Sequence, residues 1–364
     1  MKRATQLSAL AGVAALLLAA CGQAPEETGG GEGNENEAAS DFTPCIVSDA
    51  GGFDDKSFNQ LSFEGSSRAA ESLGVELLQV QSQSESDYAP NVQSLVDQGC
   101  NAIVTVGFAL SAATIESATA NPEIDYILVD DAADADFDGE TDAENIKPLL
   151  YDTAQAAFLA GYLSAGYSKA GKVGTFGGQP FPTVTIFMDG FKQGVEYYNQ
   201  AKGANVQVIG FEGGEQGSFT GGFEANETAK TTAKNIIDQG VDVILPVGGP
   251  IYQSAIAAIQ DSGREIALVG VDADFFETDP STQDLVLTSI LKKMDVSTEE
   301  AVLSSGNDEF DATPYVGTLE NGGVDIAPLH NFESKVDPAL VQEVDALREQ
   351  IISGEVPVTS YLNQ

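Results

Sequence analysis

The first residues suited to chemistry lie at positions 48–60, which read SDAGGFDDKSFNQ. Gly51 and Gly52 permit a tight backbone turn, and carboxylates, a lysine, a serine and an asparagine follow them. Phe53 and Phe58 add aromatic faces. A small-molecule site combines aromatic surface of this kind with a few hydrogen-bond donors and acceptors at fixed positions. An ordinary strand-to-helix turn with a solvated acidic loop would contain the same residues, so this stretch alone leaves both interpretations open.

Catalytic side chains are scarce in the rest of the chain. The sequence has a single histidine, His330, and we expect it to be a surface or rim residue. Ser–His–Asp and Cys–His arrangements need partners that the sequence lacks. It contains no nucleophile elbow, no Walker A loop and no G-x-G-x-x-G fingerprint. The sequence therefore predicts a protein that is not an enzyme and that uses no cofactor.

The charge of the chain excludes two classes of partner. Its 56 acidic and 16 basic residues give a net charge of −40. Nucleic-acid binding needs clustered lysine and arginine, and docking on an anionic membrane surface needs them too. We expect neither kind of binding. The acidity suits solubility at a cell surface, and either a salty habitat or a generally acidic proteome would account for it.

The N-terminus is typical of an exported lipoprotein. Two basic residues precede an apolar run at residues 7–18, which is too short to span a bilayer comfortably. The sequence Leu-Ala-Ala then leads to Cys21, which resembles the bacterial lipobox with its acylated cysteine. We expect residues 1–21 to be a lipoprotein signal peptide and residues 22–40, rich in Gly, Glu and Asn, to be a flexible tether. The mature protein would then be lipid-anchored to the cell membrane, on its extracytoplasmic face.

Strand-like and helix-like segments alternate along the rest of the chain, which is long enough for two domains. This alternation predicts an α/β fold with doubly wound parallel sheets. The layout begins again at residue 172, so we expect two similar lobes. The C-terminal remainder is too short for a third lobe, so the chain must cross between the lobes more than once. A multi-strand hinge and a closing cleft follow from such crossings. The expected lobes are residues 41–152 plus 275–310, and residues 153–274 plus 311–364.

Two cysteines remain in the expected first lobe. Cys45 opens the first strand, and Cys100 precedes an apolar run at residues 103–106. If that run is the third strand of a flavodoxin-like order, it neighbours the first strand. Both cysteines would then lie at the same end of adjacent strands. A disulfide suits a protein outside the cytoplasm, and two buried free thiols are the alternative.

An acidic loop after the fourth expected strand partly resembles a calcium site. Asp134, Asp136 and Asp138 have the spacing of the first EF-hand ligands, and Gly139 stands at the sixth position. The twelfth position is Asn145 in place of the bidentate glutamate, and a strand in place of a helix precedes the loop. We expect a solvated acidic loop without a metal, with calcium binding as the alternative.

Several separated motifs, in the same order along the chain, resemble one family. The sequence is similar to the basic membrane protein family, the PnrA-like nucleoside-binding lipoproteins of bacterial ABC transporters. The resemblance implies a type I periplasmic-binding-protein fold with two lobes and three crossovers. It also implies an extracytoplasmic receptor that delivers purine nucleosides to a permease. The motifs are SDAGGFDDKSFNQ (48–60), FLAGYLSAGYSKAGKVGTFGG (158–178), DGFKQGVEYYN (189–199), DVILPVGG (242–249), VGVDAD (269–274) and LTSILKKMDVS (287–297).

The resemblance also implies which residues bind the ligand. Phe58 and Phe219 would stack on the two faces of the base, and Asp272 would hold ribose hydroxyls. Carboxylates are suitable acceptors for hydroxyl groups, and they would repel phosphate, which favours nucleosides over nucleotides. Taken singly, each aspartate could also be a solvated carboxylate at a strand end. The implied ligand-binding residues are Asp49, Phe58, Asn59, Asp130, Phe219, Gly248, Gly249, Asp272 and Lys292.

The chain departs from the family pattern after Phe219, where it reads SFTGGFEANETAK from residue 218. The insertion makes Phe223 a competitor for the second stacking role, and Phe181 is a third candidate. Lys293 is the alternative to Lys292. These departures bear on base preference more than on the fold.

The sequence therefore predicts a lipid-anchored substrate-binding protein of an ABC transporter. A purine nucleoside would be its ligand, and transmembrane permease subunits would be its partners. A receptor for a sugar or another heterocycle, a surface sensor and a nucleoside-processing enzyme are the alternatives. The scarcity of catalytic side chains counts against the last of these.

Overall fold

The computed structural model describes residues 41–136 and 138–363. The expected signal peptide, Cys21 and the expected tether lie outside these residues. The segment Ala39–Gln364 forms one compact unit. Within the described part of the chain, no helix has the length and apolar character needed to cross a membrane.

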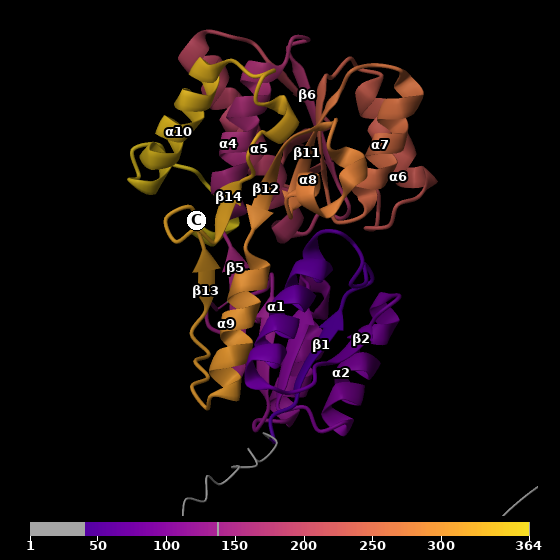
Figure 1. Cartoon of the computed structure of the whole chain (residues 1–364), viewed down its shortest axis with the longest axis vertical. Helices are drawn as coiled ribbons and strands as arrows, with labels where there is room; N and C mark the ends of the chain where they lie inside the picture. The colour runs from indigo at the N-terminus through magenta and orange to yellow at the C-terminus, as the bar shows by residue number, and fades with distance from the viewer. Residues whose placement is uncertain (1–40, 137, 364) are drawn as a thin grey trace, which may run out of the picture. The chain divides into compact units, whose positions relative to one another are not determined.

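Two six-stranded sheets form the framework of this unit (Figure 1). The first sheet has the strand order β13-β5-β4-β3-β1-β2, and every neighbouring pair is parallel. Helix α1 packs against α9 and helix α2 against α3. The strands are β1 (Pro44–Ser48), β2 (Leu78–Gln81), β3 (Ala102–Val106), β4 (Asp125–Val129), β5 (Ile146–Tyr151) and β13 (Tyr315–Gly317), and the helices are α1 (Phe58–Leu73), α2 (Tyr88–Asp97), α3 (Ser111–Ala120) and α9 (Met294–Gly306).

Side chains of β1 alternate between two hydrophobic clusters, as expected of a strand buried on both faces. Ile46 belongs to a cluster with Ala69 of α1, whereas Cys45 and Val47 belong to a cluster with Leu95 of α2. Burial on both faces explains why the strand is a continuous apolar run in the sequence.

The second sheet repeats this layout with the order β14-β12-β11-β10-β6-β7. Its pairs are parallel except for the edge strand β14, which is antiparallel to β12. A short hairpin, β8 (Phe211–Gly213) and β9 (Gln216–Gly217), follows β7. The strands are β6 (Lys172–Gly177), β7 (Gln207–Ile209), β10 (Val243–Val247), β11 (Ala267–Asp272), β12 (Val286–Lys292) and β14 (Val324–Ile326), and the helices are α4 (Thr153–Tyr167), α5 (Pro182–Lys202), α6 (Glu227–Ile237), α7 (Ile251–Ser262), α8 (Phe275–Thr278) and α10 (Pro338–Ile352).

The chain passes between the sheets at β5–α4, at β12–α9 and at β13–β14. The expected fold, two parallel-sheet lobes of the type I periplasmic-binding-protein class, is therefore confirmed. The expected lobe boundaries were wrong in two places. Strand β12, inside the 275–310 segment assigned to the first lobe, pairs with β11 of the second sheet. Strand β13, inside the 311–364 segment assigned to the second lobe, pairs with β5 of the first sheet. Both strands read as buried or edge strands, and neither pattern indicates which sheet it joins.

Glycines let the crossover helices approach their neighbours closely. A Cβ added to Gly161 of α4 would lie 2.0 Å from the carbonyl oxygen of Phe191 in α5. A Cβ added to Gly65 of α1 would lie 2.3 Å from the carbonyl oxygen of Asp295 in α9. In both the α4–α5 pair of the second lobe and the α1–α9 pair of the first lobe, a glycine thus allows close contact with the backbone of the partner helix.

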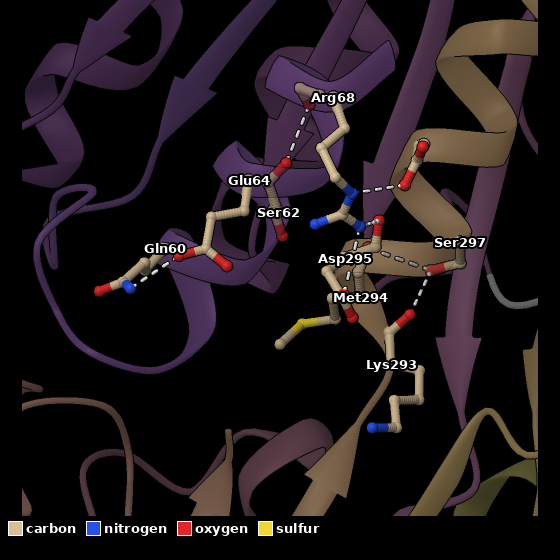
Figure 2. A network of polar contacts seen from close by, with 10 residues as sticks. Gln60, Ser62, Glu64, Arg68, Lys293, Met294, Asp295 and Ser297 are labelled. Atoms are coloured by element: carbon tan, nitrogen blue, oxygen red, sulfur yellow. Dashed lines mark hydrogen bonds and ion pairs between the residues drawn. The ribbon is translucent and has the colours of Figure 1, made fainter. Parts of the chain in front are cut away.

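Ion pairs from an arginine also connect α1 to α9 (Figure 2). Arg68 of α1 donates from Nε to Glu299 Oε2 at 2.6 Å and from Nη2 to Asp295 Oδ2 at 3.2 Å. Just before α9, the carbonyl of Lys293 accepts a hydrogen bond from Ser297 Oγ at 3.3 Å. The crossover that leaves β12 is therefore held directly against the first lobe.

The first lobe contains a disulfide between Cys45 and Cys100, whose Cα atoms are 6.0 Å apart. Strand β1 pairs with β3, and Cys45 lies opposite Ile103. Of the two alternatives that the sequence left open, the structure has the disulfide. The flavodoxin-like strand order on which that expectation depended is also present.

Candidate functional site

A cavity of about 380 Å³ lies between the two lobes. Its wall includes residues at the carboxyl ends of β1, β3 and β4 from one sheet and of β10, β11 and β12 from the other. Ligands of parallel α/β sheets bind at this end of the strands, and the volume falls in the range of small-molecule sites. The expected site residues found in this wall are Asp49, Phe58, Asn59, Asp130, Gly248, Gly249, Asp272 and Lys292.

Asp55 fixes the loop between β1 and α1. Its carboxylate accepts hydrogen bonds from the backbone N–H groups of Ser57 at 3.0 Å and of Asn59 at 2.8 Å. The Asn59 amide donates both to Asp55 Oδ2 at 3.1 Å and to Asp49 Oδ1 at 2.8 Å. These bonds anchor the start of α1, and they hold Phe58 and Asn59 at the cavity wall.

Lys292, the last residue of β12, lies between carboxylates from the two lobes. Its Nζ is 2.5 Å from Asp130 Oδ2 and 3.9 Å from Asp272 Oδ1. Asp130 follows β4 and Asp272 ends β11, and these strands hold equivalent places in the two sheets. Both aspartates have a left-handed backbone, with φ of 70° and 65°, which aspartate tolerates better than most residues. The same backbone turn thus presents one carboxylate from each lobe to one ammonium.

Aromatic rings surround the ammonium group of Lys292, which is 2% exposed. Its Nζ lies 5.3 Å from the ring centroid of Phe58, 5.1 Å from that of Phe187 and 5.6 Å from that of Tyr151. Cations at such distances are attracted to aromatic faces. The rings therefore offset part of the cost of burying the charge.

Among the described residues, the cavity wall has six carboxylates for one ammonium, and four of the six are aspartates. Burial raises the pKa of Asp49 to about 6, against hydrogen bonds from Gly51 and Asn59 that lower it. Burial raises the pKa of Asp272 to about 6, although Lys292 opposes the change. Burial also raises the pKa of Asp55 and of Asp130. Such a wall favours hydrogen-bond donors and disfavours anions.

Phe219, the expected second stacking ring, is the one implied ligand-binding residue that does not lie in the cavity wall. Residue 219 forms a parallel bridge with Gly177 at the end of β6, and a Cβ on that glycine would lie 3.0 Å from the Phe219 ring. The bridge turns the ring onto the strand, and Phe219 does not line the cavity. Phe181 and Phe223 line it instead, with ring centroids 5.8 Å apart. The centroid of Phe108, from the first lobe, is 4.9 Å from that of Phe181.

The cavity wall also contains residues that the implied ligand-binding set did not include, among them Asp55, Phe108 and Phe187. Phe108 follows the strand-end glycine Gly107, so the glycine signal that pointed to Gly248 also existed there. Asp55 stands two residues before a serine at a helix start, which is a turn-forming position. Phe187 lies inside the amphipathic pattern of α5 and carries no separate signal.

Two other basic residues lie away from the cavity. Lys293, the alternative to Lys292, is exposed. His330 approaches Asp274 Oδ2 at 2.7 Å and stacks on Phe276 with ring centroids 4.0 Å apart. The histidine is partly exposed, as expected of a surface or rim residue.

The acidic loop brings Asp134, Asp136 and Asp138 together, with one oxygen of each within 4.8 Å of the others. Their carboxylates accept hydrogen bonds from backbone N–H groups of the same loop, among them Gly139 N to Asp134 Oδ2 at 2.9 Å. These bonds account for the loop shape without an ion, and calcium binding stays an untested prediction.

Comparison with known proteins gives a consistent result. The model of the family described as ABC transporter substrate-binding protein PnrA-like matches residues 42–361. The chain is 26% identical over 376 residues to the ABC transporter nucleoside-binding protein BmpA of Lactococcus lactis subsp. cremoris, covering 99% of each chain. It is 28% identical over 312 residues to basic membrane protein A of Borreliella burgdorferi, covering 85% of this chain and 86% of the relative.

Solved structures agree with this fold. An ABC transporter solute-binding protein from Aeropyrum pernix K1 has a TM-score of 0.77 and 25% identity, covering 89% of this chain and 94% of its own. An ABC transporter solute-binding protein from Agrobacterium vitis, bound with alpha-D-tagatopyranose, has a TM-score of 0.61 and 16% identity, covering 83% of this chain and 98% of its own. The latter likeness concerns the fold alone. Given the family match over most of its length, the chain belongs to the PnrA-like (Bmp) family of ABC transporter substrate-binding proteins.

Proposed function

We propose that this protein binds a purine nucleoside in the interlobe cavity and delivers it to the permease of an ABC transporter. One observation carries the proposal: buried carboxylates with unused oxygens and aromatic rings from both lobes line the same cavity. The name of the Lactococcus relative, a nucleoside-binding protein, supports the same ligand class.

The carboxylates suit the ribose part of such a ligand. Asp49 Oδ2, Asp130 Oδ1 and Asp272 Oδ1 accept no hydrogen bond from residues 41–136 or 138–363. These free acceptors lie in residues of the cavity wall, where the hydroxyl and N–H groups of a ligand could donate to them. A phosphate group would instead bring negative charge to a wall that already has an excess of it. The cavity therefore favours a neutral, hydroxyl-rich ligand over a nucleotide.

The aromatic rings suit the base. Phe58 lines the cavity from the first lobe, and Phe181 and Phe223 line it from the second. Stacking of a base on an aromatic side chain contributes roughly 1–3 kcal/mol. A free pentose would use the carboxylates and leave the rings without a partner. The combination of rings and carboxylates thus supports a nucleoside more than a sugar.

The cellular setting of the proposal comes from the N-terminal sequence. The basic residues, apolar run and Leu-Ala-Ala-Cys ending at Cys21 indicate export and lipid attachment. A lipid-anchored receptor outside the membrane would release its ligand to permease subunits when the lobes separate.

The experiment that tests the proposal is a binding titration of the purified protein. The ligands are inosine, guanosine, adenosine, 2′-deoxyguanosine, guanosine monophosphate, free bases and ribose. We expect a purine ribonucleoside to bind, the deoxynucleoside to bind more weakly, and the monophosphate and ribose to show no binding. A ligand at a hundred times its Kd raises stability by about 2.7 kcal/mol, so thermal shift gives an independent readout.

A matched pair of variants tests the stacking role. Phe58→Leu removes a ring from the cavity wall, whereas Phe53→Leu removes a ring of the same loop that packs on Phe63 at 4.9 Å between centroids. We expect the first variant alone to lose nucleoside affinity. Binding of ribose but no nucleoside would overturn the proposal in favour of a sugar receptor. Release of free base from inosine, seen by chromatography, would instead indicate an enzyme.

A further inference from the structure

Ser57 belongs to the first lobe, but its hydroxyl contacts the second. Its Oγ lies 2.9 Å from Asp272 Oδ2 and 3.1 Å from the carbonyl oxygen of Val271. Ser57 is fully buried. Its own backbone is fixed, because its N–H donates to Asp55 Oδ1 at 3.0 Å and its carbonyl accepts from Leu61 N at 3.1 Å. A rigid part of one lobe therefore presents a hydroxyl donor to a carboxylate of the other.

The Asp272 carboxylate depends on the Ser57 hydroxyl, whereas the equivalent carboxylate of the first lobe, Asp130, is held by Lys292. Asp130 is held by Lys292 Nζ at 2.5 Å, but the same Nζ is 3.9 Å from Asp272 Oδ1, beyond hydrogen-bond distance. Within the described part of the chain, Ser57 is the one residue that donates a hydrogen bond to the Asp272 carboxylate. Without it, no hydrogen bond would fix the rotation of that carboxylate about its side-chain bonds.

We infer that Ser57 is a positioning residue that orients Asp272 for the ligand, and that it does so only when the lobes are closed. As far as the ligand is concerned, the inference rests on the proposed function. Ser57 occupies Asp272 Oδ2 and leaves Oδ1 for a hydroxyl or N–H group of the ligand. Since the bond crosses the cleft, separation of the lobes removes the donor and frees the carboxylate. The site is therefore complete in the closed protein and incomplete in the open one, which couples tight binding to closure and release to opening.

The charges that face Asp272 come from three elements. They are Lys292 at the end of β12, Asp130 after β4, and Asp55 in the loop before α1. Burial and the two carboxylates favour the protonated form of Asp272, whereas Lys292 and the Ser57 hydroxyl favour the ionised form. Removing the hydroxyl should therefore raise the pKa of Asp272 further.

A second interlobe hydroxyl provides the matched control. Thr278 Oγ1 of α8 donates to the carbonyl oxygen of Lys56 at 2.9 Å, next to Ser57 in the chain. This bond also crosses the cleft but does not reach Asp272. Thr278→Val should weaken closure in general, whereas Ser57→Ala should affect Asp272 in particular. Ser57→Thr keeps a hydroxyl and should restore the native behaviour, and Ser57→Gly serves if Ser57→Ala does not fold, since glycine is tolerated at a helix N-cap.

The first readout needs no ligand. The carboxyl carbon of Asp272 is followed by NMR during a pH titration of the full chain, with its signal assigned by Asp272→Asn. We expect Ser57→Ala to raise the Asp272 titration midpoint by about one pH unit, Ser57→Thr to restore it, and Thr278→Val to raise it less than Ser57→Ala does. Small-angle X-ray scattering of the same samples shows whether the lobes are closed, and an unchanged midpoint in closed Ser57→Ala would overturn the inference, whether or not a nucleoside binds.

The second readout is the Kd for guanosine. We expect Ser57→Ala to raise Kd about tenfold, and Ser57→Thr to stay near the native value. In an Asp272→Asn background Ser57→Ala should cause no further loss, because the two residues act as a unit. Additive losses would overturn the inference. If the native protein binds no nucleoside, the proposed function fails, and the NMR titration still decides the role of Ser57.

Discussion

Equivalent strands of the two lobes end with similar backbone conformations. The residue after β3 is Gly107, with φ of 113°, and the residue after β10 is Gly248, with φ of 136°. Asp130 and Asp272 match in the same way at β4 and β11, with left-handed φ at both. At these two pairs of equivalent strands, the backbone therefore adopts a positive φ at the same place in each lobe.

The side chains at other equivalent ends differ, and that difference makes the site. The residue after β1 is Asp49, whereas the residue after β6 is Gly178. Tyr151 ends β5, whereas Lys292 ends β12, and the two meet across the hinge. Topology thus sets where the backbone turns, and sequence divergence between the lobes sets which lobe supplies acceptors, rings or the ammonium. Neither lobe alone contains the site.

We expect the largest effect from Lys292→Met, because Lys292 is the cation that contacts a carboxylate from each lobe. The variant leaves the buried carboxylates of Asp130 and Asp272 without their cation, and we expect it to lose about 3–5 kcal/mol of stability at pH 7 and all measurable ligand binding. The loss of stability should shrink at pH 5, because the carboxylates then take up protons. Denaturant unfolding at both pH values measures the change. Lys293→Met, at the exposed neighbour, is the control, and an equal effect there would contradict the prediction.

The pH dependence should be the next largest effect. The folded-state pKa of Asp49 and of Asp272 is about 6, above the value near 3.9 of an unfolded chain. Between those values the folded protein binds more protons than the unfolded one, so stability should fall as pH rises from about 4 to about 6. Thermal melting of the ligand-free protein across this range measures it.

A double variant isolates these two groups from the general charge of the chain. Asp49→Asn combined with Asp272→Asn should flatten the fall in stability between pH 4 and 6. An unchanged slope would show that other carboxylates cause it. Ligand donors favour the ionised carboxylates, so nucleoside affinity of the native protein should increase over the same range.

Asymmetry between the matched aspartates gives a smaller effect. Asp130→Asn removes the carboxylate that Lys292 contacts at 2.5 Å, whereas Asp272→Asn removes one at 3.9 Å. We expect the first to cost about 2 kcal/mol of stability and the second to change stability by less than about 1 kcal/mol. Both should weaken nucleoside binding. Equal stability changes, measured by denaturant unfolding, would mean that the ammonium does not distinguish the lobes.

The matched glycines should show the smallest difference. Alanine at Gly107 or Gly248 must adopt a positive φ, which costs on the order of 1–3 kcal/mol. At Gly248 the new Cβ would also lie 2.6 Å from the Phe223 ring, so we expect the larger loss there. Gly222→Ala is the control, because a Cβ there meets open space without a positive φ. Calorimetric melting compares the three, and a larger loss in the control would contradict the prediction.

Much of the fold could be predicted because its signals are local. Alternating strands and helices indicated the parallel sheets, and the flavodoxin-like order brought Cys45 and Cys100 together. The lobe boundaries could not be predicted in the same way. Strand β12 is a buried apolar run, and such a run fits the middle of either sheet. Its place depends on pairing with β11, which no local pattern records.

The cavity-wall residues also fall into those that local signals predicted and those that they did not. Residues at strand ends, such as Asp130 and Gly248, were placed at the cavity because topology brings strand ends together. Phe219, the expected second stacking ring, does not lie in the cavity wall, whereas Phe223, four positions later in an irregular loop, does. Which ring faces the cavity depends there on one bridge to Gly177. The ring that lines the cavity is therefore determined by a tertiary contact and not by residue type.

The interleaved path of the chain has a consequence for biosynthesis. Arg68 and Glu299 are 231 positions apart in the sequence but share a hydrogen bond, and β13, an edge strand of the first sheet, comes later still. A growing chain therefore begins the first lobe early and cannot complete it until most of the second has been made. Until α9 arrives, the face of α1 around Gly65 has no partner. Such long-range pairing slows folding, and a chain cut between the lobes would leave two incomplete halves instead of two domains.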